Sequence, residues 1–208
     1  MTVLGFSMSM STSQEHLARR SFIGSMGATA AGLCGMSCTP KIANAATSGA
    51  TASVGVKAPS FELANSKGGM TSLESLLQDK KYTILYFYPG AFSKGCTLES
   101  IAFQRDVEKY KALNAQIVGI SVDSVEKNAQ FCAEEKLDFF MLSDKGGKVS
   151  KLYGSALSIP GFGTFSNRQT YIIAPTGELK WVFTDVESHV TRHSDEVLEK
   201  LEEIQKEA

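Results

Sequence analysis

The sequence has few cysteines and no closely spaced pair of the Cys-x2-Cys type. Its 208 residues contain four cysteines, at positions 34, 38, 96 and 132. Without a Cys-x2-Cys motif, a disulfide reductase of the thioredoxin type is disfavoured. The first two cysteines lie in an N-terminal segment that we expect to be removed, which leaves Cys96 and Cys132 for the folded domain. Two cysteines are too few for a disulfide scaffold and therefore indicate thiol reactivity.

No charge of one sign predominates, since 21 Lys and Arg residues are balanced by 22 Asp and Glu residues and the net charge is −1. Without a basic stripe there is no electrostatic basis for nucleic-acid binding. No apolar run is long enough for a convincing membrane span, and no repeat of 20–50 residues recurs. With 43% hydrophobic and 21% charged residues, the composition fits one globular domain and a tail.

Sequence motifs for cofactors are also missing. The segment "GFGTFSN" (161–167) lacks the third glycine of a dinucleotide-binding loop, and "KGGKVS" (145–150) lacks the first glycine of a P-loop. His189 and His193 have a spacing that could pair metal ligands on a helix, but no third ligand accompanies them. We therefore expect neither a metal nor an organic cofactor.

Residues 1 to about 50 differ in composition from the rest of the chain. They are rich in Ser, Ala, Gly, Met and Thr, and Glu15 is their only acidic residue. Arg19 and Arg20 precede a weakly apolar stretch and "ANAA" (43–46), an order that resembles a cleavable twin-arginine export signal. The residues ahead of the arginines suggest a two-part presequence for the chloroplast and then the thylakoid lumen. Export to a bacterial periplasm is one alternative, and a disordered tail without a signal is the other.

Apolar patterns after residue 54 predict alternating strands and helices. "YTILYFY" (82–88) and "AQIVGISV" (115–122) are almost entirely apolar, as strands buried on both faces are. The helical pattern between them completes a β-α-β unit, and "PTGE" (175–178) predicts a tight turn within a hairpin. The other elements expected are an extended segment (54–63), helices (71–77, capped by Thr71 and Glu74; 124–136; 147–154; from about Ser194) and strands (139–142, 168–174, 179–184). This order predicts one α/β domain of thioredoxin-like fold over 54–208, with a mixed central sheet flanked by helices.

The candidate site centres on "FYPGAFSKGCTLE", residues 87–99, where an apolar strand ends and a helix begins. Cys96 falls in the first turn of that helix, near unpaired backbone N–H groups. The thiolate is the nucleophilic form of cysteine, and a helix N-terminus or a neighbouring cation favours it. Pro89 ends the strand, and Ser93 can place its hydroxyl near the sulfur. The residues alone leave two interpretations open, a reactive nucleophile or an inert buried thiol.

The segment "PGAFSKGC" (89–96) resembles the peroxiredoxin motif P-x3-[T/S]-x2-C. The flanking "FYP" and "CTLESIAFQRD" resemble the peroxiredoxin Q, or bacterioferritin-comigratory, branch, and the resemblance extends from about residue 54 to the C-terminus. It implies a peroxidase in which Cys96 is the peroxidatic cysteine, Ser93 hydrogen-bonds the peroxide and Pro89 shields the oxidised sulfur. It also implies that Arg168 holds the thiolate and the peroxide. A solvated arginine at a loop end is the alternative for that residue.

The resolving cysteine departs from the pattern of many peroxiredoxin Q proteins, because the residue five positions after Cys96 is Ile101. Cys132 is then the candidate, as in another subset of the branch. If Cys132 only packs as a small apolar residue, the enzyme has one catalytic cysteine. The resemblance implies reduction of hydrogen peroxide and organic hydroperoxides, an intramolecular disulfide and recycling by thioredoxin, and we expect a monomer. A redox sensor or partner-binding module is a further alternative.

A bridge between Cys96 and Cys132 is expected to require movement. Helices that pack side by side have axes about 8–10 Å apart, whereas a disulfide needs Cα atoms about 4.4–6.8 Å apart. Leu98 is the only large apolar residue between 97 and 100, and residues 126–128 are polar. The sequence therefore predicts that the first turn after Cys96, or the 124–136 helix, unwinds readily.

Overall fold

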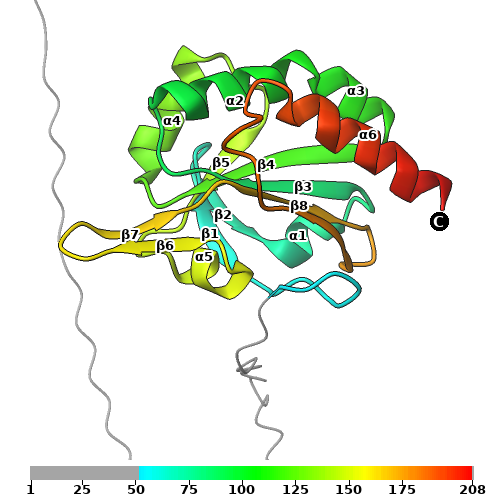
Figure 1. The fold of residues 1–208 in the computed structure, drawn as a ribbon, viewed down its shortest axis with the longest axis horizontal. Coiled ribbons are helices and arrows are strands. Elements are labelled where there is room, and N and C mark those ends of the chain that lie inside the picture. The colour runs from blue at the N-terminus through cyan, green and yellow to red at the C-terminus, as the bar shows by residue number, and fades with distance from the viewer. Residues whose placement is uncertain (1–51, 208) are drawn as a thin grey trace, which may run out of the picture. The chain divides into compact units, whose positions relative to one another are not determined.

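The computed structural model describes residues 52–207. They form a seven-stranded mixed sheet with helices on both faces, as Figure 1 shows. This confirms the predicted α/β architecture. The proposed targeting segment, residues 1–50, lies outside the described residues, so the twin-arginine signal stays a prediction. No helix between residues 52 and 207 is both long and apolar enough to cross a membrane.

The strands and helices alternate along the chain. The strands are β1 (Glu62–Asn65), β2 (Gly69–Ser72), β3 (Tyr82–Phe87), β4 (Ala115–Ser121), β5 (Phe140–Ser143), β6 (Ala156–Ile159), β7 (Gly163–Ser166), β8 (Gln169–Ile173) and β9 (Leu179–Phe183). The helices are α1 (Leu73–Leu77), α2 (Lys94–Arg105), α3 (Val107–Ala112), α4 (Val125–Glu134), α5 (Lys148–Tyr153) and α6 (His193–Lys206). The main sheet has the order β2-β1-β5-β4-β3-β8-β9, and β6 pairs with β7 separately. Within the main sheet, β3, β4 and β5 are parallel and the other pairs are antiparallel.

The two faces of the main sheet carry different helices. In Figure 1, α2, α3, α4 and α6 cover one face, and α1 and α5 cover the other. Side chains alternate along β3, so Ile84 and Tyr86 pack with the first group whereas Leu85 and Phe87 pack with the second. All four are fully buried. This confirms that β3 is a central strand buried on both faces.

Three local predictions differ from the structure. Thr71 lies in β2, which pairs with β1, so it does not cap a helix. Ser72 caps α1 instead, in a reciprocal pair of hydrogen bonds with Ser75. Glu74 accepts a hydrogen bond from the hydroxyl of Ser60. The helical segment between β3 and β4 is broken into α2 and α3, and residues 156–166, for which the pattern predicts no element, form the β6–β7 hairpin.

Asp106 separates α2 from α3 and ties both to α6. Its side chain is buried, forms ion pairs with Arg105 (2.5 Å) and Lys109 (2.8 Å), and accepts a hydrogen bond from Ser194 (2.9 Å). Burial alone would raise the pKa of Asp106, but these hydrogen bonds lower it to about 2. Arg105 also pairs with Asp195 of α6. The C-terminal end of α2 is therefore fixed.

Candidate active site

Cys96 lies in the first turn of α2, directly after the loop that follows β3. Ser93 is the N-cap of α2, and its side-chain oxygen accepts a hydrogen bond from the backbone N–H of Cys96 at 3.4 Å. The Ser93 hydroxyl also donates to Cys96 Sγ at 2.7 Å. The thiol is fully buried and lies at the positive end of the helix dipole. The serine of the motif therefore contacts the sulfur, as the spacing predicts.

The loop from Pro89 to Phe92 connects β3 to this helix. Tyr88, just before Pro89, donates its backbone N–H to Ile120 O at 3.0 Å, which extends the pairing of β3 with β4. Phe92 has a φ of 68°, in the left-handed region where a bulky side chain is strained. Its ring meets the ring of Phe131 in α4 edge-on, with 5.2 Å between the centroids. The loop is thus strained at one residue and packed against α4.

Arg168 immediately precedes β8, which pairs with β3. Its guanidinium lies beside the first turn of α2, because a Cβ added at Gly95 would be 2.7 Å from Arg168 Nη2. Arg168 is 4% exposed, so it is not the solvated loop-end arginine of the alternative interpretation. Burial alone would lower the pKa of Arg168, but the neighbouring Glu99 and Cys96 raise it above its ordinary value. A permanent positive charge therefore lies next to the thiol.

Glu99 is a site residue that the sequence pattern did not reveal. It lies three residues after Cys96, is 1% exposed, and its Oε2 accepts a hydrogen bond from Arg168 Nη1 at 2.7 Å. Glu187, which is exposed, accepts from Arg168 Nε at 2.6 Å. Burial raises the pKa of Glu99 to about 7, although Arg168 opposes this shift. One feature of the sequence could have revealed Glu99. It is an acidic residue one turn after the thiol, and a buried arginine beside that thiol requires a counter-ion.

Cys132 lies near the C-terminal end of α4 and is half-buried. Its Sγ is 3.5 Å from Ser66 Oγ, in the turn between β1 and β2. Burial raises the pKa of the Cys132 thiol, although the Ser66 contact opposes this shift. Cys96 and Cys132 are both free thiols, and both contact the core on the same side of the sheet. The two sulfurs are therefore not bridged in this structure.

The expectation that the turn after Cys96 and the 124–136 helix are held weakly is wrong in part. Glu99 and Ser100 of α2 are buried, and Ser100 Oγ is 3.1 Å from Tyr86 Oη. Asn128 of α4 is fully buried and accepts a hydrogen bond from Tyr88 Oη at 2.8 Å. Polar contacts thus hold turns for which the sequence indicates few apolar contacts. Within α2, ready unwinding therefore stays a prediction only for the residues that precede Glu99.

His189 and His193 lie where α6 begins, and only His193 is buried there. His193 begins α6, is buried, and its Nε2 is 2.8 Å from Thr170 Oγ1. Its ring packs edge-on against Phe103 and Phe183. Within residues 52–207, no group of three or more His, Cys, Asp or Glu side chains could hold a metal ion.

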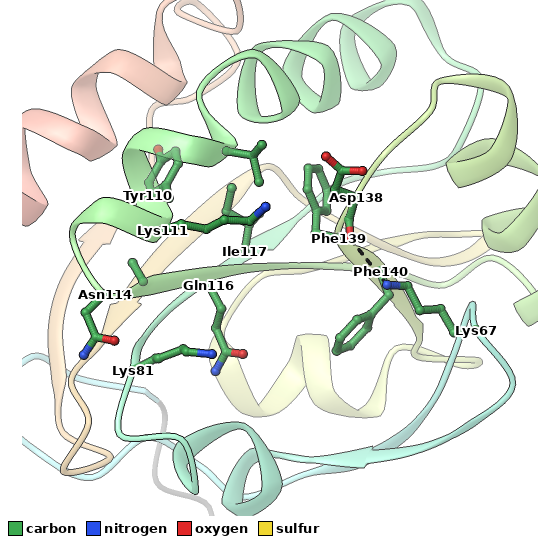
Figure 2. Close-up of a pocket in the computed structure, with 12 residues that line it drawn as sticks. Lys67, Lys81, Tyr110, Lys111, Asn114, Gln116, Ile117, Asp138, Phe139 and Phe140 are labelled. Carbon is green, nitrogen blue, oxygen red and sulfur yellow. Dashed lines mark hydrogen bonds between the residues drawn. The ribbon is translucent and has the colours of Figure 1, made fainter.

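A cavity of about 360 Å³ lies at the amino ends of β3, β4 and β5 (Figure 2). Lys67, Lys111 and Asp138 contribute polar groups to it, and Phe139 and Phe140 contribute apolar walls. Because the loop that leads to Cys96 follows the carboxyl end of β3, this cavity lies at the opposite end of the strands. It contains none of the predicted site residues.

Known proteins resemble this chain in both sequence and structure. Residues 54–182 match the AhpC/TSA family. A protein of Sedum lineare named "Peroxiredoxin Q, chloroplastic" is 36% identical over 146 residues, 70% of this chain and 76% of that protein. The structure of peroxidoxin BcpB from Mycobacterium tuberculosis matches with a TM-score of 0.69 at 30% identity, over 74% of this chain and 98% of that one. Peroxiredoxin Q of Xanthomonas campestris matches with a TM-score of 0.62 at 27% identity, over 68% and 89%.

Two further structures of the Xanthomonas campestris protein are cysteine-to-serine mutants. Their mutated positions are 36 residues apart, the same separation as that between Cys96 and Cys132 here. The match to the family spans the strand, the loop and the helix that position Cys96, and it also includes Arg168. Sequence, fold and the surroundings of the thiol agree, and the chain belongs to the AhpC/TSA family as a thiol peroxidase of the peroxiredoxin Q branch.

Proposed function

We propose that this peroxiredoxin reduces hydrogen peroxide and organic hydroperoxides with Cys96 as its peroxidatic residue, and that a thioredoxin-like protein recycles it through a Cys96–Cys132 disulfide. The observation that carries the proposal is the pair of groups around the sulfur. Ser93 Oγ is 2.7 Å from Cys96 Sγ, and the buried guanidinium of Arg168 lies beside the same helical turn. A hydroxyl and a cation at one thiol suit attack on a peroxide, because they stabilise the negative charge that develops on oxygen as the O–O bond breaks.

In the first step the Cys96 thiolate attacks one oxygen of the peroxide. An S–O bond forms and the O–O bond breaks, so Cys96 is oxidised to sulfenic acid. The departing oxygen takes up a proton and leaves as water or an alcohol. Ser93 can donate a hydrogen bond to the sulfur or to the oxygen, and Arg168 offsets the negative charge on the departing oxygen. Pro89, half-buried at the start of the loop, shields the sulfenic acid.

In the second step the Cys132 thiolate attacks the sulfur of Cys96. An S–S bond forms, the S–O bond breaks, and hydroxide leaves as water after protonation. A thioredoxin-like dithiol then reduces the disulfide and restores both thiols. The 36-residue separation shared with the Xanthomonas campestris mutants supports this role. Because a bridge within one chain needs no second subunit, we propose a monomer.

Treatment of the mature protein with one equivalent of hydrogen peroxide is expected to lower its mass by about 2 Da, the loss of two hydrogens. Cys96 and Cys132 should both resist alkylation, and peptide mapping should find them joined. Cys132→Ser should instead accumulate sulfenic acid and then the overoxidised acids. The two-cysteine mechanism is contradicted if no bridge is found and Cys132→Ser turns over normally with thioredoxin.

The one-cysteine mechanism is the second candidate, and the surroundings of Cys132 favour it. The thiol is half-buried, contacts Ser66 and has a raised pKa, as a structural cysteine would. In that mechanism an external thiol reduces the sulfenic acid of Cys96 directly. The mass of the oxidised protein separates the two mechanisms. Sustained peroxide consumption with thioredoxin separates either enzyme from a redox sensor.

We further propose that the protein is directed to the chloroplast, and within it to the thylakoid lumen. The composition of residues 1–50 and the paired Arg19 and Arg20 support this proposal, as do the relatives from Sedum lineare and Arabidopsis thaliana that are named chloroplastic. N-terminal sequencing of the native protein is expected to find a mature start near residue 46 or 47. An intact Met1 or Thr2 would contradict both this route and periplasmic export.

A further inference from the structure

Asp123, between β4 and α4, connects two parts of the molecule. Its Oδ2 accepts a hydrogen bond from the backbone N–H of Ala91, in the loop ahead of α2, at 2.7 Å. Its Oδ1 pairs with Lys127 Nζ of α4 at 2.6 Å, and Ser121 Oγ donates to Oδ2 at 3.2 Å. The Asp123 side chain is 13% exposed. One carboxylate thus contacts both the loop from Pro89 to Phe92 and the beginning of α4.

The loop needs such a contact because its conformation is strained. Phe92, next to Ala91, has its φ of 68° in the left-handed region. A residue in that region keeps its conformation only when the surrounding structure holds it there. A hydrogen bond from an N–H to a carboxylate is roughly twice as strong as one between neutral groups. The Ala91–Asp123 bond is therefore well suited to hold the strained loop in place.

We propose that Asp123 is a positioning residue for the peroxidase reaction. Through Ala91 it holds the loop so that Ser93 and Cys96 keep the 2.7 Å contact that the first step uses. The same bond ties the loop to α4 and so opposes the opening that disulfide formation needs. This inference rests on the proposed function. Its consequence is that removal of the carboxylate slows the first step and does not slow the second.

A purely structural role predicts a different result. Asp123 adjoins Ser124, the N-cap of α4, where negative charge stabilises the helix. If that were its only role, Asp123→Ala would lower the melting temperature and leave the rate constants of the folded protein unchanged. Rate constants measured on folded protein therefore distinguish the two roles.

The first step is measured in the Cys132→Ser background, where no bridge can form. The protein is mixed rapidly with hydrogen peroxide, quenched with an alkylating reagent and analysed by mass. Asp123→Ala is expected to slow the oxidation of Cys96 about tenfold or more, the effect of losing one charge-assisted hydrogen bond. Asp123→Asn keeps an oxygen that can accept from Ala91 and should stay within about threefold of the parent. Asp79→Ala, the same substitution at an exposed aspartate ahead of β3, should leave the rate unchanged.

The second step is measured with Cys132 present, as the rate at which the bridge forms after one equivalent of peroxide. Asp123→Ala is expected to form the bridge at least as fast as the parent. An unchanged first step, or a slower second step, overturns the inference. If the parent itself forms no bridge, the proposed two-cysteine mechanism fails, and the first-step comparison still tests Asp123 by itself.

If Asp123→Ala does not fold, Asp123→Glu replaces it, since the glutamate moves the carboxylate acceptor by one methylene. In Asp123→Glu the oxidation of Cys96 should be slower than in Asp123→Asn, and the reverse order overturns the inference.

Discussion

Replacing Cys96 with serine is expected to abolish peroxidase activity, with a loss of about three orders of magnitude or more in the rate of peroxide consumption. Serine has no comparable anion at neutral pH, so the nucleophile is lost. Cys132 is a poor substitute, because burial raises the pKa of its thiol and so disfavours the thiolate. The variant should fold normally, since the Ser93 hydroxyl can bond an oxygen as well as a sulfur. A thioredoxin-coupled assay and circular dichroism check both expectations.

Cys132→Ser is the matched control for this variant, because it makes the same substitution at the other thiol. It should still reduce a first equivalent of peroxide, since the Cys96 site is intact. If Cys96→Ser consumed peroxide at the parental rate, Cys96 would be removed from the reaction and the assignment of the peroxidatic residue would be lost.

Arg168→Ala is expected to slow the oxidation of Cys96 about a hundredfold, the typical effect of removing one charged donor from a reacting oxygen. It should also lower the free energy of unfolding by about 3–5 kcal/mol, because it leaves Glu99 buried without its counter-ion. Rapid-quench mass measurement gives the rate, and urea denaturation gives the stability. Glu187→Ala is the control, since it removes the exposed partner of Arg168 and keeps the buried one. An unchanged rate in Arg168→Ala would remove this residue from the site.

The stability loss in Arg168→Ala should depend on pH through Glu99. Burial already raises the pKa of Glu99 to about 7 while Arg168 opposes the shift, so removing Arg168 raises that pKa further. The folded variant is most stable while Glu99 is protonated. This stability is lost as the pH rises through the pKa that Glu99 has in the folded state. The loss should therefore be smaller at pH 6 than at pH 8. Adding Glu99→Gln to Arg168→Ala should recover stability but not the rate.

The elements that carry the thiol were predictable because their patterns are local. β3 is apolar at nearly every position, which requires burial on both faces whatever its neighbours are. Ser93 and Cys96 lie within one loop and one helical turn, so their spacing alone brings the hydroxyl to the sulfur. The hairpin of β8 and β9 likewise follows from the turn residues between its strands.

Contacts between distant segments could not be read from such patterns. Glu99 becomes a site residue only because Arg168, 69 positions later, precedes a strand that pairs with β3. Asparagine is usually a surface residue, yet Asn128 lies in the interior, where its side-chain oxygen accepts a hydrogen bond from the hydroxyl of Tyr88. Thr71 has the spacing of a helix cap, but the pairing of β2 with β1 places it in the sheet. In each case the partner is supplied by tertiary structure.

The anchoring of α2 to α6 at Asp106 limits how far the Cys96 sulfur can travel. Unwinding replaces a helical rise of about 1.5 Å per residue with an extended length of at most about 3.3–3.6 Å. If unwinding stops ahead of Glu99, the segment from Lys94 to Leu98 lengthens by about 10 Å in total. Adjacent packed helices have axes about 8–10 Å apart. Because Cys96 lies in the middle of that segment, the added length is divided between its two sides, and only part of it is available to the sulfur while the rest of the domain stays folded.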